Sequence, residues 1–531
     1  MWAVPFKESV TNIEFEDQEI NDDVYKGDDI KYKKRFISPF DAFQQVERQK
    51  EAIKKHLIEG KQDLALRFTK ELIARQRRTG KPEHIAKSLC DLAQFAKGLG
   101  SQELQLEFAL EAVAEAPNDS WSYATLGDAY RSLAEFQKSL DMYHTAGVLG
   151  KDCVALCGRA EVLKDLGQIE EALQIYEQCI WEFPADLVPR NGRAAALAYN
   201  GKLQQALDAY DEILRETPFD LVTNSGRAQV LRDMGRLDEA LKEFSDLAES
   251  YPEDIIQQNA RAEVLRELGE LEKAEEALVN IVEHFPLASE PRIAYARILR
   301  DLGRFTEALD EYNKTMTKFP LNPWAYVGVA ETYKKMGRLP EALEAYEQVM
   351  NRFPRSAIAR NGKASVLVAM GDYPNALKIL PTNLPATQNE WIAYHIQGMA
   401  QMRSGKLEKA QRIFEWGVSE IPWVSQRAYF KTALASLRVR QKRYPEVFPL
   451  VQEIIHPSIE PIAHALIMHA SGELGDTPRF NQSYESIRNT SAPVVIELRE
   501  ALAGRYRRQT SSTLPDSWFF LHECDSLLLA A

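Results

Sequence analysis

Small, apolar and helix-ending residues recur along this chain with a period of 34 residues. A glycine marks each period, an alanine follows it by five positions, and in most periods a large side chain follows the alanine by four. Because residues four apart share a helix face, the alanine and the large residue mark the buried side of one helix. The glycine ends the preceding helix, since it adopts positive φ without strain. The pattern therefore predicts a pair of helices in each period.

These rows of residues stay in register from one period to the next. The glycines are Gly167, Gly201, Gly235, Gly269, Gly303, Gly337, Gly371 and Gly405, and the alanines are Ala172, Ala206, Ala240, Ala274, Ala308, Ala342, Ala376 and Ala410. The large residues are Tyr176, Tyr210, Phe244, Leu278, Tyr312, Tyr346 and Phe414. Prolines at Pro184, Pro218, Pro252, Pro286, Pro320 and Pro354 end the second helices. We expect Asp186, Asp220 and Asp254 to cap the helices that follow.

With these residues in place, the chain resembles the tetratricopeptide-repeat family. One unit matches the favoured positions of the family with Tyr123, Leu126, Gly127, Tyr130 and Tyr143, and another with Tyr326, Ala330, Tyr333, Gly337, Ala342, Tyr346 and Pro354. The resemblance implies an all-α fold, a right-handed solenoid of helix-turn-helix repeats with a concave groove and diverged capping repeats at its ends.

The chain divides into five segments on this interpretation. Residues 1–38 form an acidic extension, 39–119 a diverged helical region, and 120–424 an array of nine repeats. Residues 425–508 form diverged C-terminal repeats with a final helix, and 509–531 an apolar tail. The acidic extension is a candidate self-ligand that competes for the groove. The terminal Leu-Ala-Ala resembles a bacterial degradation tag.

Composition narrows the chemistry that we expect. The net charge is −13, which opposes general attraction to nucleic acids or anionic membranes. The start of the sequence lacks the features of a secretory signal and no apolar run is long enough to span a bilayer, so we expect a cytoplasmic protein. The five cysteines include Cys153 and Cys157, four apart, which we expect to be ordinary thiols because a structural zinc site requires four ligands. No catalytic motif appears, so we expect no enzyme, no metal and no cofactor.

Candidate binding residues follow from the repeat register. We number each unit from 1 so that its proline falls at position 32. The resemblance implies that positions 2, 5, 9, 12 and 13 face the concave groove. The predicted groove residues are Asn191, Asn259 and Asn361 at position 5, Lys164, Arg232, Arg266, Arg300 and Lys334 at position 12, and Trp324 at position 2. Asparagine can bind a peptide backbone, and arginine can grip a carboxylate with two hydrogen bonds.

A second basic row lies at position 7, where the family prefers leucine. Its members are Arg159, Arg193, Arg227 and Arg261, with Lys363 further along. In one interpretation, each side chain runs its apolar stem along the helix pair and places its charge on a carboxylate or helix end of a neighbouring unit. In the other, the row is a cationic ladder for an acidic partner.

The resemblance therefore implies a non-catalytic scaffold or adaptor that binds a protein partner. We expect an acidic, extended or helical partner segment in the groove, with homo-oligomers also possible. Three alternatives stay open: a regulator that senses a small ligand or peptide, a helical-repeat protein associated with RNA, and an enzyme whose site lies in the C-terminal helices.

Overall fold

A computed structural model describes residues 39–79, 81–150, 153–381, 390–421, 424–452, 454, 459–488, 499–500 and 502–503. Three sequence-based hypotheses fall outside this part of the chain. They concern the acidic extension and its self-ligand role, the tail with its terminal Leu-Ala-Ala, and most of the final helix predicted for residues 492–508.

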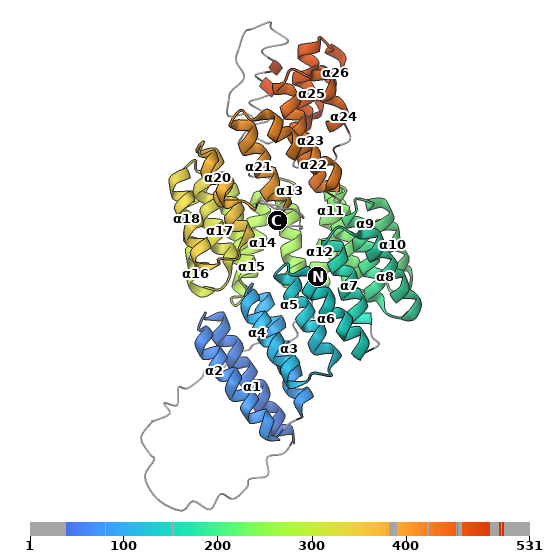
Figure 1. The fold of residues 1–531 in the computed structure, drawn as a ribbon, viewed down its shortest axis with the longest axis vertical. Helices are drawn as coiled ribbons and strands as arrows, with labels where there is room; N and C mark the ends of the chain where they lie inside the picture. Colours follow the sequence, from blue (N-terminus) through green and yellow to red (C-terminus); the bar gives the residue numbers. More distant parts are fainter. Residues whose placement is uncertain are drawn as a thin grey trace, which may run out of the picture.

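All regular secondary structure in the described residues is helical, as expected (Figure 1). The helices before the array are α1 (Pro39–Ile58), α2 (Gln62–Thr79), α3 (Pro82–Gly98) and α4 (Gln102–Glu115). None of the described helices is both long enough and apolar enough to cross a membrane.

Eighteen helices follow as consecutive pairs. They are α5 (Ser120–Ser132), α6 (Phe136–Leu149), α7 (Cys153–Asp165), α8 (Ile169–Glu182), α9 (Leu187–Tyr199), α10 (Leu203–Glu216), α11 (Leu221–Asp233), α12 (Leu237–Ser250), α13 (Ile255–Glu267), α14 (Leu271–His284), α15 (Glu290–Asp301), α16 (Phe305–Lys318), α17 (Pro323–Lys335), α18 (Leu339–Arg352), α19 (Ala357–Ala369), α20 (Tyr373–Ile379), α21 (Trp391–Arg403) and α22 (Leu407–Glu420). Helix α20 has only 7 residues where its counterparts have 14, and Pro381 follows shortly after its end.

The C-terminal helices are less regular than the array. They are α23 (Val424–Arg440), the 3-10 turn η1 (Tyr444–Glu446), α24 (Phe448–Val451), α25 (Glu460–Leu474) and α26 (Thr477–Ser486). The sequence predicted two worn helix pairs here. The second helix of the first pair is reduced to η1 and α24, because Pro445 and Pro449 cannot donate helical hydrogen bonds.

Local sequence signals explain where the helices begin and end. The expected positive φ is present, for example 78° at Gly167 and 75° at Gly235. The expected aspartate caps are confirmed: the Asp220 carboxylate accepts a hydrogen bond of 2.8 Å from the backbone N–H of Thr223, and Asp254 does the same for Ile256 at 2.8 Å. The helix pairs are therefore set by local chemistry.

Packing between neighbouring helices builds the core. The alanines that open the second helices, such as Ala172 and Ala206, have 0% exposure. The buried apolar residues of the described chain separate into eight clusters rather than one globular core. This is the arrangement expected when each repeat packs only on its neighbours.

The array also turns back on its own N-terminal region. Figure 1 shows α1–α4 at one end, α23–α26 at the other, and the remaining helices wound between them. Leu321, in the loop between α16 and α17, belongs to the same buried cluster as residues of α1–α5. A Cβ added at Gly100 would lie 3.2 Å from Cδ of Pro323. Residues more than two hundred positions apart in sequence therefore touch.

Candidate partner-binding groove

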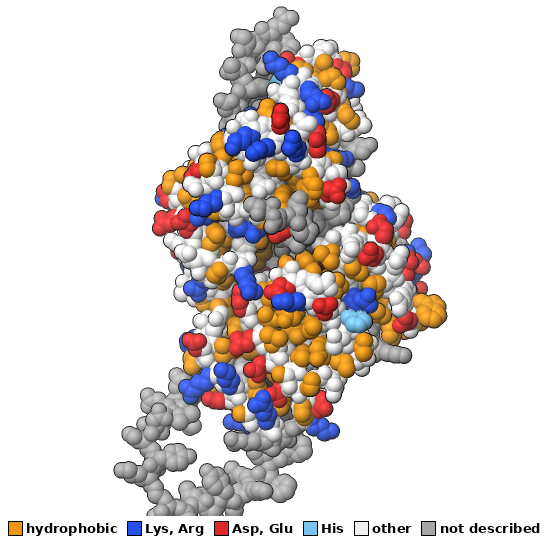
Figure 2. Space-filling view, in the orientation of Figure 1, with side chains coloured by type: hydrophobic (Ala, Val, Ile, Leu, Met, Phe, Trp, Pro, Cys, Tyr) orange, Lys and Arg blue, Asp and Glu red, His pale blue; other side chains and the backbone are white. Residues whose placement is uncertain are grey.

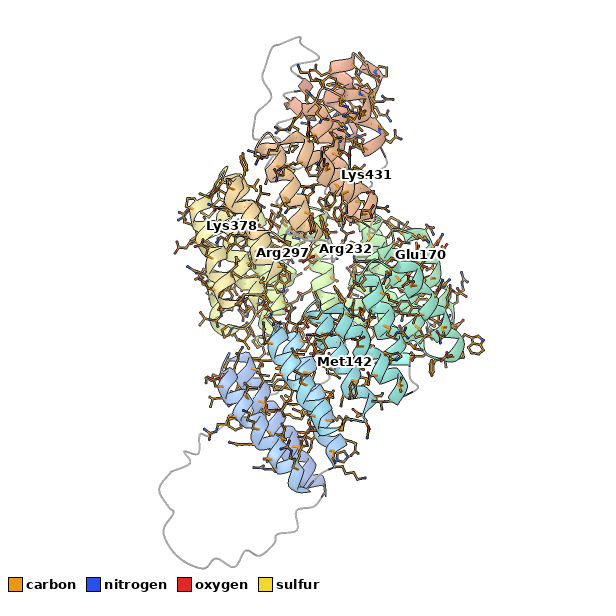
Figure 3. The ribbon with its side chains drawn as sticks, in the orientation of Figure 1. Met142, Glu170, Arg232, Arg297, Lys378 and Lys431 are labelled. Carbon is orange, nitrogen blue, oxygen red and sulfur yellow. The ribbon has the colours of Figure 1, made fainter. Side chains whose placement is uncertain are left out.

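The predicted position-12 residues lie in the last turn of the first helix of their units. Lys164 is on α7, Arg232 on α11, Arg266 on α13, Arg300 on α15 and Lys334 on α17. Figure 3 places Arg232 and Arg297 near the middle of the molecule, whereas Glu170 and Lys378 lie towards its two sides. We call the position-9, -12 and -13 residues of α5 to α17 the groove ladder.

Three bases of the groove ladder face an acid of the next repeat. Arg131 Nε lies 2.5 Å from Asp165 Oδ2, Arg232 Nε lies 3.3 Å from Glu267 Oε1, and Arg266 Nη1 lies 3.6 Å from Asp301 Oδ2. Each pair joins position 12 of one unit to position 13 of the following unit. The basic and acidic residues that the sequence places side by side in one unit therefore connect two different units.

Lys164 and Arg300 make other contacts, because the residue at position 13 of the next unit is not an acid. Tyr199 stands there after Lys164, and the Lys164 ammonium lies 5.8 Å from the centre of the Tyr199 ring. Lys335 stands there after Arg300. The Arg300 guanidinium instead lies 3.7 Å from Asp301 of its own unit, and Lys335 also pairs with Asp301, at 2.9 Å.

The pKa values of two position-13 acids, Asp301 and Asp233, shift in opposite directions. Burial alone would raise the pKa of the Asp301 carboxyl, but Arg300, Lys335 and Arg266 outweigh this effect and hold the pKa below its ordinary value. Asp233 has no base at position 12 of the preceding unit, where Ala198 stands. Desolvation by surrounding protein atoms raises the pKa of Asp233, even though its side chain remains accessible to solvent.

Position 9 adds a second row of acids. Glu161 accepts hydrogen bonds from Arg131 at 2.8 Å, from Lys164 at 2.8 Å and from the Tyr176 hydroxyl at 2.5 Å. Glu263 pairs with Arg266 at 3.0 Å and with Arg297. Each of these carboxylates therefore bridges two repeats or two helices of the array.

The predicted asparagines of position 5 differ among themselves. Asn191 Oδ1 accepts a hydrogen bond of 2.9 Å from the Thr223 hydroxyl of the next unit. The buried Oδ1 of Asn259 accepts no hydrogen bond from the residues that the structure describes. Asn361 is only 1% exposed. Trp324, at position 2, is 40% exposed and lies at the beginning of α17.

The position-7 row contacts carboxylates of second helices. Arg193 Nε lies 3.6 Å from Glu177, Arg227 Nε lies 2.6 Å from Asp211, and Lys363 Nζ lies 2.9 Å from Glu347. In each case the acid belongs to the preceding unit, and Arg227 also pairs with Glu243 of its own unit. These contacts are of the kind that the inter-repeat interpretation requires.

Two members of this row make no ion pair in the described part of the chain: Arg159 and Arg261. At the position that holds Glu177 or Asp211 for the other members, the preceding units have His144 and Ser245. Arg159 lines a surface hollow of about 470 Å³ together with Asp141, His144 and Glu171.

Two ladder residues, Arg131 and Lys335, were not singled out from the sequence. Arg131 was missed because its unit is one residue shorter than the others, which displaces the register. Arg297 and Tyr199 were expected at groove positions, but their partners, like those of Lys335, depend on how one repeat is rotated against the next. Figure 2 shows acidic and basic side chains interspersed over the visible face, without a broad patch of one sign.

The chain was compared with models of protein families and with curated proteins. A family model described as "Tetratricopeptide repeat" matches residues 157–220, 225–280, 259–323 and 330–380. No curated protein matches the chain.

Solved structures were compared as well. The yeast Tom70 structure is 14% identical, covers 86% of this chain and 99% of its own, and has a TM-score of 0.42. A tetratricopeptide-repeat protein from Parabacteroides merdae is 19% identical over 55% of this chain and 100% of its own, with a TM-score of 0.35. The APC/C Cut9–Hcn1 structure is 14% identical over 88% of this chain and 96% of its own, also at 0.35. The repeat pattern, the paired helices and the family match together identify this chain as a tetratricopeptide-repeat protein.

Proposed function

We propose that this chain is a non-catalytic scaffold or adaptor that holds an acidic segment of a partner protein in the groove of its superhelix. Tetratricopeptide-repeat proteins generally mediate protein–protein interactions. The partner segment is extended or helical, and its carboxylates meet the bases of the groove ladder. The observation that carries the proposal is the regular placement of one position-12 base per repeat on α11, α13, α15 and α17.

The internal ion pair of Arg232 leaves capacity for a partner. Arg232 contacts Glu267 through Nε at 3.3 Å, and its Nη1 donates to Gln229 at 3.1 Å. A guanidinium has five N–H donors, so Arg232 can donate two hydrogen bonds to a second carboxylate in a bidentate arrangement. Its side chain is 28% exposed, and that of Glu267 is 29% exposed. A carboxylate of the partner can therefore replace Glu267 at small cost, because partly exposed pairs contribute only about 0–1 kcal/mol.

The ladder also favours a partner with regular spacing. From α11 to α17 its position-12 bases recur once per repeat, so a segment that follows the groove meets them in sequence rather than all at one point. Multipoint contact of this kind gives specificity even where single contacts are weak.

The test is affinity capture of the intact protein from its native cells, followed by mass spectrometry. The groove variant combines Arg232→Glu, Arg266→Glu and Arg300→Glu. A matched variant combines Arg193→Glu, Arg227→Glu and Lys363→Glu, which changes the net charge by the same amount on the position-7 row. Circular dichroism checks that both variants keep their helices.

We expect the wild type and the position-7 variant to retain a common set of partners that the groove variant loses. The affinity of a purified partner segment for the groove variant should fall at least about tenfold, or about 1.4 kcal/mol. Retention of the same partners by all three proteins would contradict the proposal. Loss from the position-7 variant alone would move the binding surface to the position-7 row.

A further inference from the structure

Three cysteines from two different helices meet inside one repeat. Cys153 and Cys157 lie one turn apart on α7, and Cys179 lies on α8. All three are buried, with exposures of 5%, 2% and 0%. Their three Sγ atoms lie within 4.8 Å of one another, and those of Cys157 and Cys179 are 3.8 Å apart.

A carboxylate completes this cluster. Asp186 caps α9, and its Oδ1 accepts a hydrogen bond of 2.9 Å from the backbone N–H of Val188. Its Oδ2 lies 2.7 Å from Cys153 Sγ. The capping role therefore uses one oxygen and directs the other at the sulfur atoms.

The fold itself does not require cysteine at these positions. In the next unit, the residues equivalent to Cys153, Cys157 and Cys179 are Leu187, Asn191 and Ile213. Three of the five cysteines of the chain thus gather in one repeat, although any of several side chains serves the packing elsewhere.

We propose that Cys153, Cys157, Cys179 and Asp186 form a structural zinc(II) site. Zinc accepts four ligands in a tetrahedron, with thiolate sulfur at about 2.3 Å and carboxylate oxygen at about 2.0–2.2 Å. Two sulfur ligands of such a tetrahedron are about 3.8 Å apart, which is the separation of Cys157 and Cys179 Sγ.

Zinc binding at these four residues can be written with protons and charge accounted for. Each of the three thiols releases its proton to the solvent, and the Asp186 carboxylate is already ionised. Three thiolates, one carboxylate and Zn²⁺ carry a net charge of −2, the same as in the common four-cysteine zinc sites. The metal would join α7, α8 and the beginning of α9, and so fix two consecutive repeats to each other.

This inference reverses an expectation from the sequence. The separation between Cys153 and Cys157 offered only two ligands, and Cys179 and Asp186 become neighbours only when α8 folds back on α7. Cys157 stands at repeat position 5, as Asn191 does in the next unit, but its side chain is only 2% exposed. None of the four ligands belongs to the groove ladder, so the groove variant leaves the site intact.

The test uses full-length protein, reduced with a phosphine and freed of metal with a chelator. Zinc(II) is then added in competition with a chromophoric chelator, and native mass spectrometry counts the bound ions. Cobalt(II) replaces zinc in a parallel sample, because its absorption spectrum reports tetrahedral thiolate ligands. We expect one zinc ion per chain, a cobalt–thiolate charge-transfer band, and a higher unfolding midpoint when zinc is bound.

Matched variants separate ligands from packing. Cys157→Ser and Cys179→Ser should lower zinc affinity by roughly 100-fold or more, and Asp186→Asn by roughly 10–100-fold. Asparagine is also a good helix cap, so Asp186→Asn keeps the beginning of α9. Cys90→Ser, at a buried cysteine of α3 outside the cluster, and Asp220→Asn, at the equivalent cap of α11, should bind zinc like the wild type.

Several outcomes would overturn the proposal. One is a reduced wild-type protein that binds no stoichiometric zinc, a measurement that does not depend on any variant folding. Another is zinc binding that survives Cys157→Ser unchanged. If Asp186→Asn alone has no effect, Asp186 is not the fourth ligand. If the reduced protein does not bind zinc, while the oxidant diamide forms a disulfide between Cys157 and Cys179, the cluster is a redox-active thiol pair instead.

Discussion

Glu161 illustrates how one side chain serves both packing and charge. It is 9% exposed and accepts hydrogen bonds from Tyr176, Lys164 and Arg131, residues of three different helices. Burial alone would raise the pKa of the Glu161 carboxyl, but Lys164 and Arg131 outweigh it and hold the pKa far below its ordinary value. Glu161 is therefore ionised in the folded protein at neutral and mildly acidic pH.

The depressed pKa predicts a loss of stability in acid. A carboxyl whose pKa is lower in the folded state stabilises the protein above its unfolded pKa, near 4.3, and this stability is lost as pH falls towards the folded pKa. We expect Glu161→Gln to lower the free energy of unfolding by about 1–3 kcal/mol at pH 7 and to flatten its decline below pH 5. Urea unfolding followed by circular dichroism at several pH values checks this.

An exposed glutamate provides the control for this experiment. Glu239 pairs with Arg236 on the surface, so Glu239→Gln should change neither the stability at pH 7 nor its pH dependence appreciably. An equal pH dependence in the wild type and Glu161→Gln would show that Glu161 does not contribute to acid unfolding.

At the scale of helices, aromatic residues and glycines vary together. Tyr210 of α10 packs on Gly226 of α11, and a side chain at Gly226 would place its Cβ 2.6 Å from Tyr210 Cζ. The same contact joins Tyr176 to Gly192, Tyr312 to Gly328 and Tyr346 to Gly362. Where the large residue is Phe244 or Leu278, the equivalent positions are Ala260 and Ala294. The size of the second-helix side chain thus sets the space left on the next first helix.

This fit predicts that adding one methyl group destabilises the array. Alanine normally stabilises a helix interior by about 1 kcal/mol relative to glycine. We nevertheless expect Gly226→Ala to lower the free energy of unfolding by about 1–3 kcal/mol, because the methyl group overlaps the Tyr210 ring. Urea denaturation of the purified variant measures the change.

Gly98 of α3 is the matched position for this prediction. A Cβ there meets nothing within 4 Å, so Gly98→Ala should leave the stability unchanged or raise it slightly. Stabilisation by Gly226→Ala as well would mean that Tyr210 can move aside freely, and that the close contact does not limit the helix pairing.

At the scale of the whole molecule, the superhelix closes on its own N-terminal helices. Leu321 is 9% exposed and packs with apolar residues of α1–α5, while Pro320 and Pro323 touch Gly60 and Gly100. A second contact of long sequence separation brings Tyr199, at the end of α9, against the buried cluster that begins with α19 and includes residues of α26. These contacts limit how far the helical array can open.

Breaking the first contact should open the array. We expect Leu321→Asp to destabilise this contact by about 2–4 kcal/mol, since it removes a buried leucine and introduces an unpaired charge. The radius of gyration from small-angle X-ray scattering should increase, and hydrogen exchange in α1–α4 should become faster.

Leu287 is the control, because it holds the same repeat position one unit earlier and is 55% exposed. Leu287→Asp should leave the scattering profile and the exchange rates as in the wild type. An unchanged radius of gyration in Leu321→Asp would mean that other contacts suffice to hold the ends of this turn together.

The repeat spacing places the position-12 bases along the chain, but it does not predict which acids they meet. Position 12 falls in the last turn of α7, α11, α13, α15 and α17, because it is fixed by the spacing from the repeat glycines. The acid that each base meets was not predicted, since Glu267 lies 35 positions after Arg232 and the two meet only through the rotation between repeats. Whether these residues bind a partner stays a prediction.

By itself, the sequence determined the helix pairs of this protein, their caps and their repeat family, because these depend on residues a few positions apart. The short glycine turns, aspartate caps and alanine contacts recur along the array and need no distant partner. Only the tertiary structure decided that Leu321 meets α1–α5 and that Cys179 and Asp186 join Cys153 and Cys157. The reason is physical: the first contact depends on small rotations summed over many repeats, and the second on which faces of α7 and α8 are turned towards each other.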